Sequence, residues 1–230
     1  MYGTAVSTTY DATHKNTYDS TIKVAVDKWY EDNLKNNYAN YLEDSLFCND
    51  KTIASSSIGE YNSTLGYSNS TTYYASTERV RYSSGTTDIT IAKPTFECAE
   101  NATNDYSRFT VNETTLPNGN KTNGDLTYPI GLLTVDEVAY AGARTSTTNQ
   151  SYYLYNSSIT STWWLLSPYG FDGSYPYNAY AWFVVHEVGS FARYNISFAY
   201  AFRPSINLKI NILTNGGDGT SSNPYRVKLS

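Results

Sequence analysis

The chain has 230 residues, a formal net charge of -5 and only 16% charged residues, against about a quarter in an ordinary soluble domain. A pI near 5.0 argues against nucleic-acid binding, and no apolar run reaches the roughly 18–20 residues that span a bilayer. A hydrophobic content of 40% excludes a disordered chain. Tyrosine fills 24 positions and histidine only 2, which favours a contact surface over a catalytic pocket.

The N-terminal part of the chain predicts a tail followed by two helices. Residues 1–18 show no periodicity and read as a linker or tail. Apolar side chains then recur every three or four residues, which predicts a helix capped by Asp19 or Ser20. A second, shorter helix is predicted over residues 38–46, after the interruption at Asn36 and Asn37.

The middle of the chain gives weaker signals. Residues 54–88 are rich in Ser, Thr, Tyr and Gly without a period, and either long loops or short strands fit them. Residues 90–97 and 108–111 are strand-like, and residues 117–125 form a turn-rich loop.

The second half predicts a strand, a short helix and then several strands. A strand over residues 128–133 leads into Thr134 and Glu137, which have the spacing of a capping box. The helix that begins there should end at Gly142. The later strand-like runs are separated by Gly, Pro, Asn or Ser and cover residues 163–166, 181–185, 202–208 and 225–229.

Residues 215–219 (NGGDG) predict a turn. Two early helices followed by short strands indicate an α+β fold. We expect one domain over residues 19–230, within the size that a single core supports.

Cys48 and Cys98 are the two cysteines of the chain. They could be two unrelated buried thiols or one disulfide, and we favour the disulfide. A disulfide indicates an extracellular or cell-surface protein, and we expect its export or anchoring segment to lie outside this sequence.

Catalytic and metal-binding patterns are weak. His186 is the one histidine that could serve a nucleophile, but an ordinary surface histidine is the better interpretation. The neighbouring carboxylates Asp136 and Glu137 do not face each other on a helix, and Asp218 alone falls short of the six to eight oxygens that calcium takes. We therefore expect no enzyme activity, no metal and no cofactor.

The strongest functional signal lies between residues 145 and 202. Only Asp172, Glu187 and Arg193 are charged in these 58 residues, and 10 of the 31 residues from 171 to 201 are aromatic. Tyrosines mixed with Ser, Asn and Gly are typical of antibody paratopes, where they offer contact area at a low entropy cost. We interpret this stretch as a binding surface, and Trp163, Trp164 and Trp182 as core.

Two runs flank this stretch: WWLLSP at 163–168 and FRPSINL at 202–208. They resemble the strands that frame the variable segment of proteins diversified by retroelements (diversity-generating retroelement variable proteins). These proteins have a C-type-lectin-like fold, shared with formylglycine-generating enzymes. Residues 20–29 resemble the first helix of the family, and residues 128–132 with Asp136 and Glu137 resemble its mid-chain strand and helix. Ala201 departs from the glycine that is usual there.

The resemblance implies a C-type-lectin-like ligand-binding domain with a variable segment at about 169–201. The function it implies is that of an adhesin or receptor-binding protein whose partner is a protein or glycan on another cell or phage host. Trp163, Trp164, Trp182, Arg203 and Pro204 would be scaffold. The expected contact residues are Asp172, Ser174, Tyr175, Tyr177, Asn178, Tyr180, His186, Phe191, Arg193, Tyr194, Ser197, Phe198 and Tyr200.

Two alternatives stay open. A carbohydrate-binding lectin without diversification would also use tyrosines and tryptophans, which stack on sugars. An enzyme of the formylglycine-generating type would need active-site cysteines, and neither Cys48 nor Cys98 lies in the C-terminal half where that site is expected.

Overall fold

The structure is a computed structural model, and it describes residues 18–54, 71–80, 93–98, 107–145, 147–172, 178–220 and 222–228. Its helices are α2 (Thr21–Asn33), the 3-10 helix η1 (Ala39–Tyr41), α3 (Ala75–Val80) and α4 (Val135–Tyr140). The longer strands are β6 (Trp163–Asp172), β7 (Asn178–Val184) and β8 (Phe191–Asn195). The short strands are β1 (Leu42–Glu43), β2 (Phe47–Cys48), β3 (Thr71–Tyr73), β4 (Arg108–Phe109), β5 (Gly131–Leu132), β9 (Ala201–Phe202), β10 (Pro204–Ser205) and β11 (Asn207–Leu208). The predicted α+β class is confirmed.

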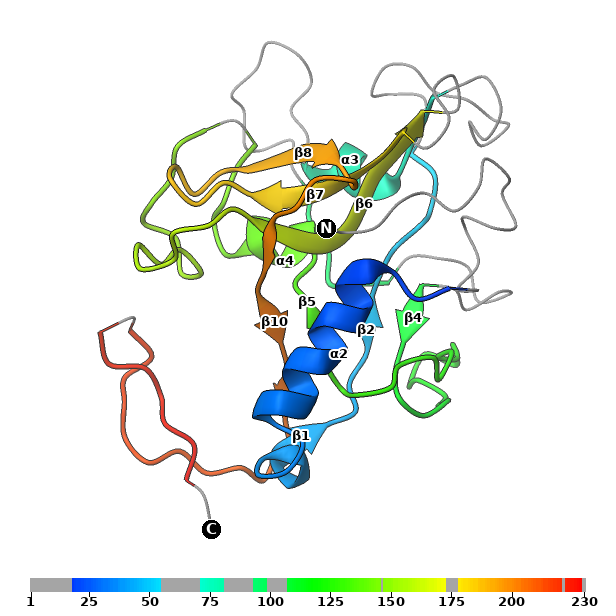
Figure 1. Ribbon diagram of the computed structural model, residues 1–230. Helices are drawn as coiled ribbons and strands as arrows, with labels where there is room; N and C mark the ends of the chain where they lie inside the picture. The colour runs from blue at the N-terminus through cyan, green and yellow to red at the C-terminus, as the bar shows by residue number, and fades with distance from the viewer. Residues whose placement is uncertain are drawn as a thin grey trace.

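The largest sheet in the described part of the chain has five strands. β3, β6, β7 and β8 follow one another as antiparallel neighbours, and β9 pairs with β6 in parallel. Helices α3 and α4 contact β6 (Figure 1). The strands predicted at 163–166 and 181–185 are therefore present, and both are longer than expected.

Alternating side chains of this sheet divide the core into two clusters. Trp163, Trp182 and Phe191 pack with Val135 and Val138 of α4. Trp164 and Phe183 face the opposite way and pack with α2 and with β5. Because successive residues of a strand point to opposite faces, adjacent tryptophans such as Trp163 and Trp164 serve different clusters. Both clusters are buried, since Trp163, Trp164 and Trp182 are each at most 3% exposed.

Two predicted helix starts are confirmed. The Ser20 hydroxyl accepts from the backbone N–H of Lys23 and caps α2. Thr134 accepts from the backbone of Glu137, whose carboxylate accepts in turn from the backbone N–H of Thr134. This capping box begins α4, and Gly142 follows its end with a φ of 114°, as the sequence predicted.

Two local predictions are wrong. Instead of a helix over 38–46, one 3-10 turn leads into β1, because Leu42 and Glu43 pair with Leu208 and Asn207 near the end of the chain. Residues 93–97 are not a strand: the backbone N–H of Lys93 donates to the carbonyl of Arg79, and the chain bends at 96–97. In both places long-range contacts override the local pattern. Residues 90–92 lie outside the described residues.

The predicted strand at 202–208 is divided among three partners. β9 pairs with β6, β10 with β5 and β11 with β1, so each short strand joins a different part of the molecule. Beyond it, residues 209–228 project away from the sheet (Figure 1). The turn at 215–219 is confirmed by positive φ angles at Gly216, Gly217 and Gly219. The strand predicted at 225–229 is reduced to one bridge between Thr214 and Val227.

The undecided stretch at 54–88 contains β3 and α3, and its residues 55–70 and 81–88 lie outside the described part. The same holds for residues 1–17 of the predicted tail. In the part of the chain that the structure describes, none of the helices combines the length and apolarity that crossing a bilayer requires.

Candidate functional site

Three rings of the predicted contact set form one cluster, which we call the aromatic face: the exposed Tyr194 and Phe198 and the half-buried Tyr200. The Tyr194 and Phe198 rings meet edge to face with centroids 4.4 Å apart, and Tyr200 lies 6.2 Å from Tyr194 and 6.4 Å from Phe198. Tyr194 is 41% exposed and Phe198 46% exposed. Rings in such mutual contact are oriented before a ligand arrives, which lowers the entropy cost of binding.

The chain positions these rings by crossing over the sheet. After β8, a turn closes where the Asn195 side chain accepts from the backbone N–H of Ser197 and the Asn195 carbonyl accepts from Phe198. The segment then runs from the edge strand β8 to β9 beside β6. Phe198 and Tyr200 are therefore carried across one face of the sheet, next to Tyr194.

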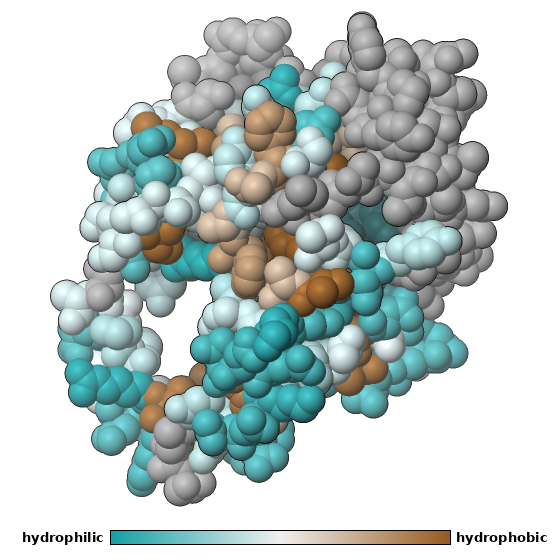
Figure 2. All heavy atoms as spheres, viewed as in Figure 1, coloured by the Kyte–Doolittle hydropathy of each residue, from teal (hydrophilic) through white to brown (hydrophobic). Residues whose placement is uncertain are grey.

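Buried rings support the aromatic face from below. Tyr200 lies 5.1 Å from Trp164 and 5.2 Å from Phe183, and Tyr194 lies 6.4 Å from Phe183. Burial raises the pKa of Tyr200, and the neighbouring Tyr194 raises it further. Figure 2 shows hydrophobic residues gathered at the centre of the molecule's face, above the hydrophilic surface of α2.

The remaining described contact residues do not all share this face. Tyr180 and Arg193 lie on the other side of the sheet, where both meet the buried ring of Tyr169. The Arg193 guanidinium stacks 4.8 Å from the centre of that ring, a cation–π contact. The described contact residues therefore lie on both faces of the sheet, and the ring cluster lies on the face of Tyr194.

Phe191 was predicted to contact the ligand, and that prediction is wrong. It is 1% exposed and packs edge to face on Trp182, with centroids 5.4 Å apart. The β8 register opposes it to Val184, in the cluster next to α4.

His186 lies in the turn between β7 and β8. Its Nδ1 is 3.4 Å from the Thr162 hydroxyl and its Nε2 is 3.9 Å from Glu187. Ser197 is exposed in the turn that leads to the aromatic face. The backbones of Asp172 and Asn178 pair with each other, and their side chains lie outside the description. Ser174, Tyr175 and Tyr177 lie outside the described residues altogether.

The runs that flank the contact stretch hold the fold together. Ser167 accepts from the backbone N–H of Val135, and the Pro168 carbonyl accepts from the Ser76 hydroxyl. Arg203 donates to the Leu154 carbonyl at 2.7 Å and stacks over the ring of Trp163. Burial lowers the pKa of Arg203. These contacts are structural, as expected of a scaffold.

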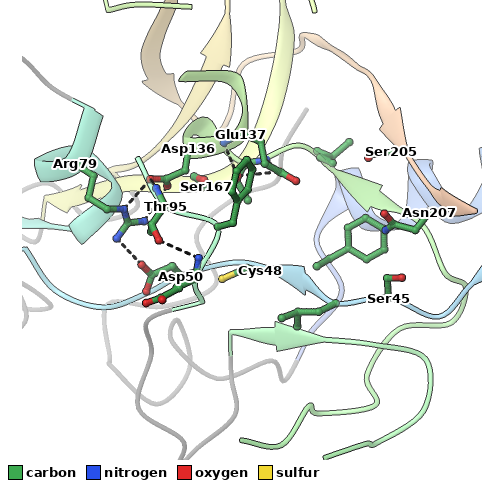
Figure 3. A pocket seen from close by; sticks show the side chains of 16 residues that line it. Ser45, Cys48, Asp50, Arg79, Thr95, Asp136, Glu137, Ser167, Ser205 and Asn207 are labelled. Atoms are coloured by element: carbon green, nitrogen blue, oxygen red, sulfur yellow. Dashed lines mark hydrogen bonds and ion pairs between the residues drawn. The ribbon is translucent and has the colours of Figure 1, made fainter. Parts of the chain in front are cut away.

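A second feature, a buried ion triad, was missed by the sequence analysis. Arg79 binds both oxygens of Asp136 at 2.7 and 2.9 Å and reaches Asp50 at 2.8 Å (Figure 3). The triad borders a polar cavity of about 140 Å³. Burial lowers the pKa of Arg79, but the two carboxylates outweigh it and raise the pKa overall. No local motif marks these residues, because Arg79 is 29 positions from Asp50 and 57 from Asp136.

The triad links three separate segments of the chain through charged hydrogen bonds. Asp136 also accepts from the backbone N–H of Thr95 and Asp50 from that of Thr52, so each carboxylate has partners on both oxygens. The expected disulfide joins Cys48 to Cys98 beside this cavity. Among the described residues, no three His, Cys, Asp or Glu side chains gather as a metal ion would require.

No protein-family model, curated protein or solved structure matches this chain.

Proposed function

We propose that the chain is a ligand-binding protein and that the aromatic face is its contact surface. The observation that carries this proposal is the cluster of three mutually packed rings in which Tyr194 and Phe198 are exposed and Tyr200 is half-buried. Exposed aromatic rings in such clusters are typical of binding hot spots. In our proposal the face binds a protein or glycan on another cell or phage host, and the chain has no catalytic role.

The finer proposal is a C-type-lectin-like domain diversified by a retroelement. The structural contacts of Ser167 and Arg203 support it, because these residues stand in the two framework-like runs and hold the scaffold. Sequencing sibling copies of the gene tests it. We expect variation to cluster within about residues 169–201, and variation spread evenly along the chain would contradict the diversification.

The disulfide bears on two further points. It supports an extracellular or cell-surface location, because disulfides persist in oxidising compartments. It also engages both cysteines of the chain, so the formylglycine-generating type of chemistry has no free thiol here. We therefore keep only the undiversified lectin as a second candidate function, favoured by the exposed rings of the aromatic face.

A binding experiment separates these functions. The labelled protein is applied to a glycan array and to a panel of intact cells, with and without protease treatment of the cells. We expect the double variant Tyr194→Ala with Phe198→Ala to lose binding by a factor of about 30. Tyr153→Ala is the matched control, because Tyr153 is 74% exposed outside the face.

Loss of binding after protease treatment indicates a protein ligand, and signal on the glycan array indicates a glycan ligand, as the lectin requires; the sibling sequences then decide whether the surface is diversified. Unchanged binding by the double variant contradicts the proposed contact surface.

A further inference from the structure

A short segment, residues 93–98, lies against the two helices that carry Arg79 and Asp136 of the ion triad; we call it the strap. The backbone N–H of Lys93 donates to the Arg79 carbonyl at 2.8 Å, at the end of α3. The backbone N–H of Thr95 donates to Asp136 of α4 at 3.1 Å. Three strap residues line the polar cavity of about 140 Å³ that the triad borders (Figure 3). The strap is therefore part of the cavity wall.

The C-terminal end of the strap is fixed by the disulfide. Cys98 is joined to Cys48 of β2, and the Arg108 guanidinium donates to the Cys98 carbonyl at 3.1 Å. Strand β2 has its own attachment to the fold, because Phe47 and Cys48 pair with Phe109 and Arg108 of β4. The disulfide therefore ties the strap to a strand that is held in place without it.

The strap itself contributes little to the core. Phe96 is 69% exposed, and its ring stacks on that of Tyr140, which is 56% exposed, with centroids 4.3 Å apart. None of the strap residues belongs to either core cluster. Segments with few buried apolar contacts open at a lower free energy than the whole domain. The covalent bond at Cys98 is therefore the strongest attachment of the strap among the described contacts.

The disulfide is within reach of a reductant. Cys48 and Cys98 are both half-buried rather than buried, and the rate of thiol–disulfide exchange depends on such access. A dithiol attacks one sulfur as a thiolate and forms a mixed disulfide, which its second thiol resolves. The bond between the two cysteines breaks and both become thiols, while the dithiol gives up two electrons and two protons and becomes a cyclic disulfide.

We propose that the Cys48–Cys98 disulfide is a redox-sensitive switch: its reduction by a dithiol releases the strap and opens the cavity beside the triad, while both core clusters stay packed. The strap includes no residue of the aromatic face. The switch therefore does not depend on the ligand-binding function proposed above.

The test follows hydrogen exchange of the full chain by mass spectrometry, with and without dithiothreitol at about pH 8, where thiolates form. We expect the peptide that contains the strap to exchange at least about tenfold faster after reduction. Peptides from β6 and β7 should keep their slow exchange, and the fluorescence of the buried tryptophans should not change. The rate of reduction should stay constant as urea is added below the unfolding transition, because the sulfurs are reached without global unfolding.

Variants and reoxidation locate the effect. Cys48→Ser combined with Cys98→Ser should show the fast strap exchange without dithiothreitol. In the reduced protein, Phe96→Ala should speed strap exchange by a further factor of about three, because it removes the ring stack. Tyr153→Ala is the matched control, since Tyr153 is 74% exposed outside the strap. Oxidised glutathione takes up the two electrons and two protons as two thiols and should restore the slow exchange in the wild type.

Three results would each overturn the proposal. They are unchanged strap exchange after reduction, reduction that occurs only once urea unfolds the whole chain, and loss of the buried tryptophan signal together with the disulfide.

Discussion

Replacing Arg79 with methionine tests whether the ion triad stabilises the fold. The substitution keeps an unbranched side chain of similar length and removes the charge together with three hydrogen bonds, to Asp136 at 2.7 and 2.9 Å and to Asp50 at 2.8 Å. Asp50 is 5% exposed and Asp136 is 3% exposed. Two negative charges would then remain buried near each other without a cation.

The expected loss follows from what the carboxylates keep. After the change, Asp136 retains one backbone donor, from Thr95, and Asp50 one from Thr52. Removing one partner of a buried ion pair costs about 3–5 kcal/mol, because the remaining charge stays desolvated. We expect Arg79→Met to lower the free energy of unfolding by that amount, which is a large fraction of the roughly 5–15 kcal/mol of a typical domain.

Urea unfolding followed by tryptophan fluorescence measures the loss, since Trp163, Trp164 and Trp182 are all buried. Arg79→Lys keeps the charge but loses the two-pronged contact, and an intermediate loss is expected. Adding Asp50→Asn and Asp136→Asn to Arg79→Met removes the unpaired charges and should recover part of the stability.

The result that would refute this reasoning is a loss below about 1 kcal/mol in Arg79→Met, the range of an exposed ion pair. A strong weakening of the wild type by 1 M salt would refute it too, because salt screens exposed pairs far more than buried ones.

Three further predictions concern the disulfide, one tyrosine and strand β8. Replacing Cys48 and Cys98 with serine removes a cross-link between residues 50 positions apart and should lower the free energy of unfolding by about 4 kcal/mol in the loop-entropy model. Urea unfolding measures the loss, and the reduced wild type serves as the comparison. Burial raises the pKa of Tyr152 to about 12, so the stability that its neutral hydroxyl contributes is complete below about pH 10 and is lost as the pH rises toward 12. Tyr152→Phe should therefore lose less of its free energy of unfolding between about pH 10 and 12 than the wild type, and identical pH profiles would contradict this. Phe191→Ala should lower the free energy of unfolding by about 3–5 kcal/mol, whereas Tyr194→Ala should lower it by less than about 1 kcal/mol because the ring is exposed. Equal losses in calorimetry would show that the two sides of β8 do not differ in their contribution to stability.

Features set by neighbouring residues could be predicted from the sequence. The capping box of Thr134 and Glu137 needs only a spacing of three residues, and the cap of α2 needs only Ser20 at the start of an apolar period. The disulfide could be predicted because the chain has two cysteines. The burial of Trp163 and Trp164 followed from their apolar strand-like surroundings.

Features set by distant pairing could not be predicted. The triad joins Asp50, Arg79 and Asp136 from three separate segments. Leu42 became part of a strand only because Leu208 returns beside it. The face to which each aromatic residue points depends on strand register, and a shift of one residue would reverse every assignment. The composition of the stretch therefore predicts a contact surface, which stays a prediction, but it could not separate the buried Phe191 from the exposed Tyr194.

That separation would let one strand serve both the stability of the fold and the proposed binding. The side chains of Phe191 and Arg193 point toward the cluster next to α4, where Phe191 packs on Trp182 and Arg193 on Tyr169. Tyr194 points to the opposite side and joins the rings of the crossing segment. Asp136 of the triad belongs to α4, so the buried ion triad lies next to the cluster on the first side. Substitution of Tyr194 or Phe198 on the second side changes an exposed ring and leaves the contacts of the first side intact, which is what the proposed diversification requires.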